Sequence, residues 1–163
     1  LPENTASPEA RCEMVRRLTA DRPWAQLDTL EIDRGGASYT VDTLRELRGH
    51  YPGNVELYFI TGADAVAHIV QWRESAAIAD LARLIAVTRP GYALTAERRR
   101  EIEEHGRFDV SYLEVTALAV SSSDLRARVR AGRSIRYLVM QRVLDYIAVH
   151  GLYAPEAAGE VRR

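Results

Sequence analysis

Apolar and polar residues alternate along the chain with two different periods. Between residues 8 and 20, apolar side chains recur at helical spacing behind Ser7, a residue type that caps helices, so a helix is predicted there. Over residues 25–32 the pattern changes to alternation, which predicts a half-buried strand. A second helical pattern begins at Thr40, which is expected to cap it, and ends at Gly49.

Three short apolar runs predict the strands of a sheet, at residues 55–60, 84–88 and 110–115. The first run is nearly continuous, as parallel strands buried on both faces are. Strands that alternate with helices indicate an α/β domain with a mainly parallel sheet, in which ligands bind beyond the carboxyl ends of the strands. The helices expected after these runs cover residues 95–105, 123–131 and 137–150.

Composition is that of a globular protein. Of 163 residues, 47% are hydrophobic and 28% are charged, and residues 1–153 are expected to form one domain followed by a frayed tail at 154–163. The single cysteine, Cys12, excludes an internal disulfide and fits a reducing compartment. No apolar run approaches the ~20 residues that span a bilayer, and the first residues do not resemble a signal peptide. We therefore expect a cytoplasmic protein with no membrane partner.

The basic residues are all of one kind. All 22 are arginines, which excludes mechanisms that need a lysine Schiff base or the lysine of a phosphate-binding P-loop. Residues 1–81 hold 8 arginines and 13 acids, a net charge of -5, whereas residues 82–163 hold 14 arginines and 10 acids, a net charge of +4. An anion is therefore expected to bind in the C-terminal half. The four histidines lack metal-ligand spacing, so no protein-held metal is expected.

Three serines stand at the start of the helix expected at 123–131, with Arg126 one turn later. Free backbone N–H groups, hydroxyls and the positive helix end make an anion site there, and Arg126 can add a bidentate contact to phosphate. A helix cap with solvated serines explains the same residues equally well. The arginines between 128 and 136 allow an RNA-binding interpretation, but the lack of lysines and interleaved aromatics disfavours it.

Four further residues are candidates for ligand contact. Gly62 lets a ligand approach the backbone after a strand, and Asp64 could accept from ribose hydroxyls, although a glycine there is more often only a turn. Trp72 could stack on a flat ring, although a tryptophan at helical spacing is more often part of the core. Arg89 lies on a loop and could face the ligand, or be an ordinary surface arginine.

Taken together, several ordered motifs resemble one family. They cover residues 7–11, 37–44, 62–65, Trp72, 88–92, 120–126 and 151–153. In this order and at these spacings they closely resemble bacterial nicotinate-nucleotide adenylyltransferase. The likeness implies a Rossmann-like nucleotidyltransferase fold with a three-layer α/β/α arrangement. It also implies transfer of AMP from ATP to nicotinate mononucleotide in NAD biosynthesis, giving nicotinate adenine dinucleotide and pyrophosphate, with Mg²⁺ entering on the ATP phosphates.

The resemblance assigns roles to particular residues. For ATP, Ser121, Ser123 and Arg126 would hold the phosphates, and Gly62 and Asp64 would contact the adenosine.

For the pyridine nucleotide, Trp72 would stack on the ring, and Thr40 with the backbone at Arg73 would receive the nicotinate carboxylate. Arg89 would face the phosphate region of the dinucleotide.

One motif of the family is not found in these 163 residues: the glycine-rich turn with His-x-Gly-His that stabilises the triphosphate. The likeness begins near residue 7, after the point at which the family has passed its first strand and helix. We assign no catalytic residue within residues 1–163. We expect residues 1–163 alone to turn over poorly and, with an unpaired sheet edge, to associate into homo-oligomers.

Three alternatives remain open at this point. The chain could use another acceptor, such as nicotinamide mononucleotide or phosphopantetheine, although Ser38-Tyr39-Thr40 and Trp72 favour nicotinate. It could be a nucleotide-binding module without catalysis, which would bind without turnover. It could also bind RNA through its C-terminal arginines. This alternative would be excluded if the chain bound only mononucleotides, with an affinity that does not depend on salt.

Overall fold

The computed structural model describes residues 5–88, 94–116 and 120–155. The chain divides into two compact units. The sheet unit is Asp33–Leu118, and the helical unit combines Leu1–Ile32 with Ala119–Arg163.

The sheet unit is built on three parallel strands. Strand β1 is Tyr58–Gly62, β2 is Arg83–Thr88 and β3 is Val110–Glu114, in the order β1-β2-β3. The prediction of a parallel sheet is confirmed for these strands, and the expected run 84–88 is β2 almost residue for residue. The first strand lies later than expected, because residues 55–57 are not part of it.

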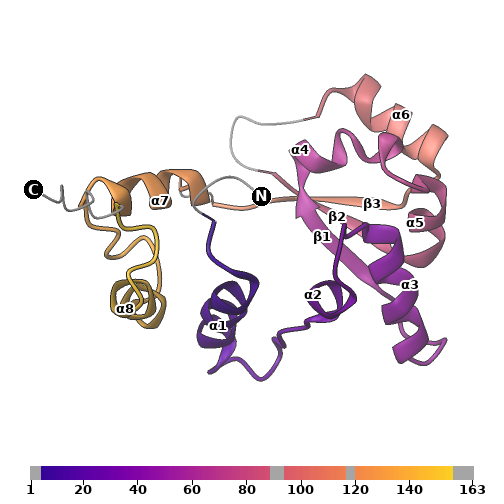
Figure 1. The fold of residues 1–163 in the computed structure, drawn as a ribbon. Helices are drawn as coiled ribbons and strands as arrows, with labels where there is room; N and C mark the ends of the chain where they lie inside the picture. Colours follow the sequence, from indigo (N-terminus) through magenta and orange to yellow (C-terminus); the bar gives the residue numbers. More distant parts are fainter. Residues whose placement is uncertain (1–4, 89–93, 117–119, 156–163) are drawn as a thin grey trace, which may run out of the picture. The chain divides into compact units, whose positions relative to one another are not determined.

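One face of this sheet is covered by helices (Figure 1). The core places Val41, Ile78 and Ile102, from three different helices, with Leu84 and Ala86 of β2. Burial of such side chains contributes about 1.5–3 kcal/mol each. The helices of the unit are α3 (Thr40–His50), α4 (Ala63–Val66), the 3₁₀ helix η1 (Ile69–Gln71), α5 (Ser75–Leu81) and α6 (Ala96–Gly106).

The opposite face of the sheet is not buried within this unit, so the expected burial of the first strand on both faces is not found there. Tyr58, Ile60 and Leu113 keep 48%, 62% and 52% of their surface exposed. The register pairs Ile60 with Ile85, which is only half-buried. A helical layer on this second face, and with it the three-layer arrangement, stays a prediction.

The helical unit contains α1 (Pro8–Thr19), α7 (Ser122–Arg130) and α8 (Gln141–Val149). The predicted cap of α1 is confirmed, since Ser7 Oγ accepts from the Ala10 N–H at 3.2 Å. Helix α8 packs against α1, and Arg142 donates to the Asp21 carboxylate at 2.9 Å. The positive φ angles of Gly132 and Gly151 allow the chain to turn after α7 and α8. Whether residues 1–153 form one domain stays a prediction.

The strand predicted at 25–32 is wrong, because residues 30–34 form a short helix, α2 (Leu30–Arg34). Asp28 explains the difference: its carboxylate accepts from the Leu30 N–H at 2.9 Å. A local side-chain bond of this kind competes with strand pairing and favours the start of a helix.

Two helix boundaries also differ from those expected. Thr40 is the first residue of α3 rather than its cap, which is Tyr39, and Gly49 lies inside the helix. Helix α8 begins at Gln141 and not at 137, since Tyr137 has φ +67°, a left-handed conformation that interrupts a helix. Among the described residues, no helix is long and apolar enough to cross a bilayer.

Candidate functional site

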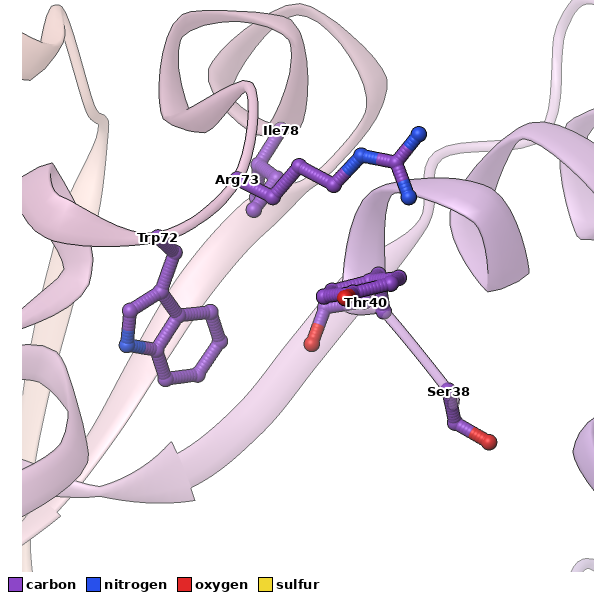
Figure 2. Close-up of a pocket in the computed structure, with 6 residues that line it drawn as sticks. Ser38, Thr40, Trp72, Arg73 and Ile78 are labelled. Atoms are coloured by element: carbon purple, nitrogen blue, oxygen red, sulfur yellow. The ribbon is translucent and has the colours of Figure 1, made fainter. Parts of the chain in front are cut away.

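A cavity of about 340 Å³ opens in the sheet unit between the start of α3 and the turn that follows η1. Figure 2 shows Thr40 and Trp72 facing this cavity from different elements, with the Arg73 side chain reaching toward α3. The three residues expected to meet the nicotinate group, Thr40, Trp72 and Arg73, are therefore brought together. The cavity is lined by Ser38, Tyr39, Thr40, Trp72, Arg73 and Ile78.

The start of α3 offers hydrogen-bond donors to this cavity. Tyr39 occupies the cap position, and its side chain makes no capping bond. Among the described residues, neither the N–H nor the hydroxyl of Thr40 has a hydrogen-bond partner. Because α3 is 11 residues long, its positive end adds to these donors. The arrangement suits a carboxylate or a phosphate.

Trp72 packs against the core and also lines the cavity. Its ring meets Phe59 of β1 edge-to-face, with the centroids 6.1 Å apart, and it packs on the core cluster while lining the cavity. It directly follows η1, and its backbone N–H donates to the Ile69 carbonyl at 3.0 Å. The packing holds the indole in one place, so a flat ring that enters the cavity finds a fixed aromatic surface.

Arg73 is held loosely. Its guanidinium lies over the Tyr39 ring, 4.6 Å from the centroid, and its nearest carboxylates, those of Asp42 and Glu74, are both 3.7 Å away. In the part of the chain that the structure describes, neither its side chain nor its backbone N–H makes a hydrogen bond. Arg73 can therefore offer both to a ligand.

Three charged residues around the cavity were not expected from the sequence. Arg45 donates to both carboxylate oxygens of Glu74, at 2.5 and 3.3 Å, and lies 3.7 Å from Asp42. This hydrogen bond holds the pKa of Glu74 below its usual range. The spacing of Asp42 and Arg45 reveals their contact along one helix. The contact of Arg45 with Glu74, 29 positions along the chain, leaves no signal in the pattern.

The start of α7, in the helical unit, has a different geometry. Ser121 Oγ accepts from the Asp124 N–H at 3.1 Å, so the capping interpretation of Ser121 holds. Ser123 Oγ accepts from Arg126 at 3.3 Å, which places these two candidates side by side. Both serines are exposed, and Arg126 also lines a largely apolar cavity of about 340 Å³ in this unit. Their role in phosphate binding stays a prediction.

The remaining candidates lie outside both arrangements. Gly62 ends β1 with φ -67° and an open space where a Cβ would stand, so the backbone there is approachable although its conformation does not require glycine. Asp64 is exposed in the first turn of α4. Neither residue lines the Trp72 cavity. Arg89 lies outside the described residues.

Comparison with known proteins places the chain in a family. Residues 1–128 match the model of the cytidylyltransferase-like family. A protein of Moorella thermoacetica, named probable nicotinate-nucleotide adenylyltransferase, is 42% identical over 153 residues, which is 93% of this chain and 70% of that protein. A protein of Frankia alni with the same name is 47% identical over 152 residues, 93% of this chain and 77% of that protein.

The chain belongs to the nicotinate-nucleotide adenylyltransferase family. Its fold agrees with that of a solved relative. The nicotinic acid mononucleotide adenylyltransferase of Plasmodium falciparum, solved in complex with APC and with NaAD, superimposes with a TM-score of 0.70 at 19% identity. The superposition with the NaAD complex covers 93% of this chain and 76% of that one. The expected Rossmann-like nucleotidyltransferase fold is thereby confirmed.

Proposed function

We propose that this protein transfers the AMP group of ATP to nicotinate mononucleotide, giving nicotinate adenine dinucleotide and pyrophosphate. The observation that carries the proposal is the cavity in which Thr40, Trp72 and Arg73 meet, in a chain 42% and 47% identical to relatives named for this reaction. The product is a precursor of NAD, which places the protein in NAD biosynthesis.

The cavity fits the nicotinate ring and its carboxylate. We infer that the pyridine ring stacks on Trp72, and that the carboxylate accepts from the Thr40 hydroxyl and from the N–H groups of Thr40 and Arg73. These donors lack partners among the described residues, and each hydrogen bond to a charged group contributes about 1.5–3 kcal/mol. A carboxamide would bring two N–H groups against the same donors, so the site favours the acid.

ATP would bind through the residues at the start of α7. Arg126 already donates to the Ser123 hydroxyl there. A phosphate would replace that hydrogen bond and accept from both side chains. Gly62 and Asp64 would meet the adenosine, and Arg89 would face the phosphate region of the dinucleotide.

We expect Mg²⁺ to accompany the ATP phosphates, since this ion binds through few carboxylates and keeps several waters. Within residues 5–88, 94–116 and 120–155 there is no group of three or more His, Cys, Asp or Glu side chains arranged around one point.

The reaction itself needs no covalent intermediate. A phosphate oxygen of the mononucleotide attacks the α-phosphorus of ATP, the bond from that phosphorus to the bridging oxygen breaks, and pyrophosphate leaves. Such transfer depends on the position of the reactants and on stabilisation of the developing charge. The residues assigned above bind and orient the two substrates; none is assigned to the chemical step.

The test is turnover by the full-length protein. ATP is mixed with nicotinate mononucleotide or nicotinamide mononucleotide at equal concentration, and dinucleotide and pyrophosphate are measured together. The proposal predicts equimolar products, with a kcat/KM at least tenfold higher for the nicotinate substrate. A preference for the amide would support the alternative acceptor. Binding of both substrates without any product would support a binding module without catalysis.

A further inference from the structure

Two walls of the Trp72 cavity are joined by charged side chains. One wall is the start of α3, and the other is the turn of residues 72–74 between η1 and α5. Arg45 of α3 holds Glu74 of the turn at 2.5 Å, and Arg73 of the turn lies 3.7 Å from Asp42 of α3. Both contacts therefore cross from one wall to the other.

These four side chains close into a ring of alternating charge. Asp42 contacts Arg45, Arg45 contacts Glu74, Glu74 contacts Arg73 and Arg73 returns to Asp42. The ring has no net charge, and each cation lies between two anions. The guanidinium of Arg45 donates to Glu74 at 2.5 and 3.3 Å, whereas that of Arg73 lies 3.7 Å from both Asp42 and Glu74. The Arg45–Glu74 pair thus anchors the ring, and Arg73 is the member left available to a ligand.

The backbone of the turn needs such an anchor. Glu74 has φ +50° and ψ +46°, a left-handed conformation that costs a residue other than glycine about 1–2 kcal/mol. A strained residue of this kind persists where its surroundings hold it. Here the bidentate contact with Arg45 holds the Glu74 side chain while its carbonyl accepts from the Ala77 N–H at 2.9 Å. The conformation of Glu74 in turn sets where the preceding residue, Arg73, presents its N–H.

We propose that the ring formed by Asp42, Arg45, Glu74 and Arg73 sets the width of the Trp72 cavity and thereby the affinity for an anionic pyridine mononucleotide. The inference rests on the proposed function. Asp42, Arg45 and Glu74 are positioning residues, because they act through Thr40, Trp72 and Arg73 rather than on the ligand. The ring fixes the donors on the two walls at one separation, so that a single carboxylate meets both.

Direct binding tests the ring without any need for turnover. Residues 1–163 hold two tryptophans and Trp24 is 81% exposed, so a Trp24→Phe background leaves Trp72 as the tryptophan of these residues whose fluorescence reports binding. Nicotinate mononucleotide is titrated into the full-length protein carrying this change, and then into Glu74→Gln and Arg45→Gln. Each neutral variant is expected to raise the Kd about fivefold, the upper end of what an exposed ion pair contributes.

A cycle of variants separates positioning from general destabilisation. The double variant Arg45→Gln/Glu74→Gln is expected to match each single variant within about twofold, because both changes break one contact. The Tm should stay nearly unchanged, since exposed pairs contribute little to stability. Glu46→Gln is the matched control: its partner Arg34, at 2.6 Å, lies in α2 and not in the turn, so the Kd should not move.

The outcomes distinguish the ring from the function on which it rests. If nicotinate mononucleotide does not change the Trp72 fluorescence of the parent Trp24→Phe protein, the proposed function fails. If the parent binds and both Glu74→Gln and Arg45→Gln keep its Kd, the ring has no role in affinity. Additive losses in the double variant, or an equal loss in Glu46→Gln, would also overturn the ring, because the losses would then not depend on the contact between Arg45 and Glu74.

Discussion

The two helix starts that carry the candidate residues differ in whether their hydrogen-bond donors already have partners. At α7, Ser121 caps the helix and Ser123 accepts from Arg126, so the side chains are already paired. At α3, the cap position is Tyr39, which makes no capping bond, and Thr40 keeps its N–H and hydroxyl without partners among the described residues.

The difference bears on how each start would bind an anion. A missing cap costs a helix about 1 kcal/mol, and a bound carboxylate at α3 would supply the acceptors that the chain itself does not. At α7 a phosphate must replace bonds that the helix start already makes. An anion would therefore bind at the α3 start without replacing any contact among the described residues, whereas at the α7 start it would have to replace existing contacts. Substitutions at the two helix starts should have different consequences.

The largest effect is expected at Trp72. Trp72→Ala removes the stacking surface beside the α3 start, and stacking on an aromatic side chain contributes about 1–3 kcal/mol, so the Kd for nicotinate mononucleotide should rise roughly 5- to 150-fold. Calorimetric titration measures it, and the Kd for ATP should not change. Because Trp72 also packs on Phe59, the Tm will fall; Trp72→Phe keeps part of that packing and should lose less affinity. An unchanged Kd in Trp72→Ala would remove the pyridine ring from this cavity.

A smaller effect is expected at the paired start. Arg126→Gln removes a charged donor to phosphate but also frees Ser123, so ATP affinity should fall by about tenfold, near the lower end for a bond to a charged group. Nicotinate mononucleotide binding should be unaffected. Arg128→Gln is the matched control, because Arg128 lies in the same helix and is paired with Asp124 at 2.7 Å. Equal losses in both variants would mean a general charge effect.

Ser121 allows capping and ligand binding to be separated. Ser121→Ala should lower the free energy of unfolding by about 1 kcal/mol, whereas Ser121→Gly should lower it by only a few tenths. Chemical denaturation measures both. If the hydroxyl also contacts phosphate, the ATP affinity of Ser121→Gly should stay as low as that of Ser121→Ala. Recovery of ATP affinity together with stability would show that Ser121 is a cap alone.

The smallest effect concerns pH at the α3 side. The hydrogen bond from Arg45 lowers the pKa of Glu74. The Arg45–Glu74 ion pair is therefore fully formed at any pH above the usual pKa of glutamate, and it is lost only as the pH falls through the lowered pKa. The ratio of the Kd of Glu74→Gln to that of the parent should therefore stay constant from pH 8 down to about pH 5. A ratio that drifts toward one already near neutral pH would mean that the pair does not hold Glu74 ionised.

Local patterns predicted the elements whose causes are local. The run at 84–88 became β2, and the serine that caps α1 was read from its neighbours alone. The strand expected at 25–32 was wrong because Asp28 bonds to the backbone of Leu30, a contact that alternation of apolar residues does not reveal. The exposure of Ile60 was missed for a related reason. A hydrophobic side chain favours burial, but the sequence pattern does not reveal whether a neighbouring element covers it.

The candidate site was predictable in part. Thr40, Trp72 and Arg73 were expected through resemblance, and the structure brings them to one cavity. The ring around them depends on the left-handed conformation of Glu74 and on a contact 29 positions along the chain, neither of which has a signature in sequence. Tyr39 was expected only as part of the Ser38-Tyr39-Thr40 element, and its contact with the Arg73 guanidinium was not expected, because that contact follows from the fold.

The most direct test of this account is the selectivity of the α3 start for a carboxylate. Equilibrium Kd values for nicotinate and nicotinamide mononucleotide are measured on the full-length protein and on Thr40→Val, which replaces the hydroxyl by a methyl group of similar size. We predict a preference of at least about tenfold for the acid, since one bond to a charged group contributes about 1.5–3 kcal/mol, and a loss of most of that preference in Thr40→Val. Equal affinity for the two mononucleotides in the parent, or a preference that Thr40→Val leaves intact, would contradict it.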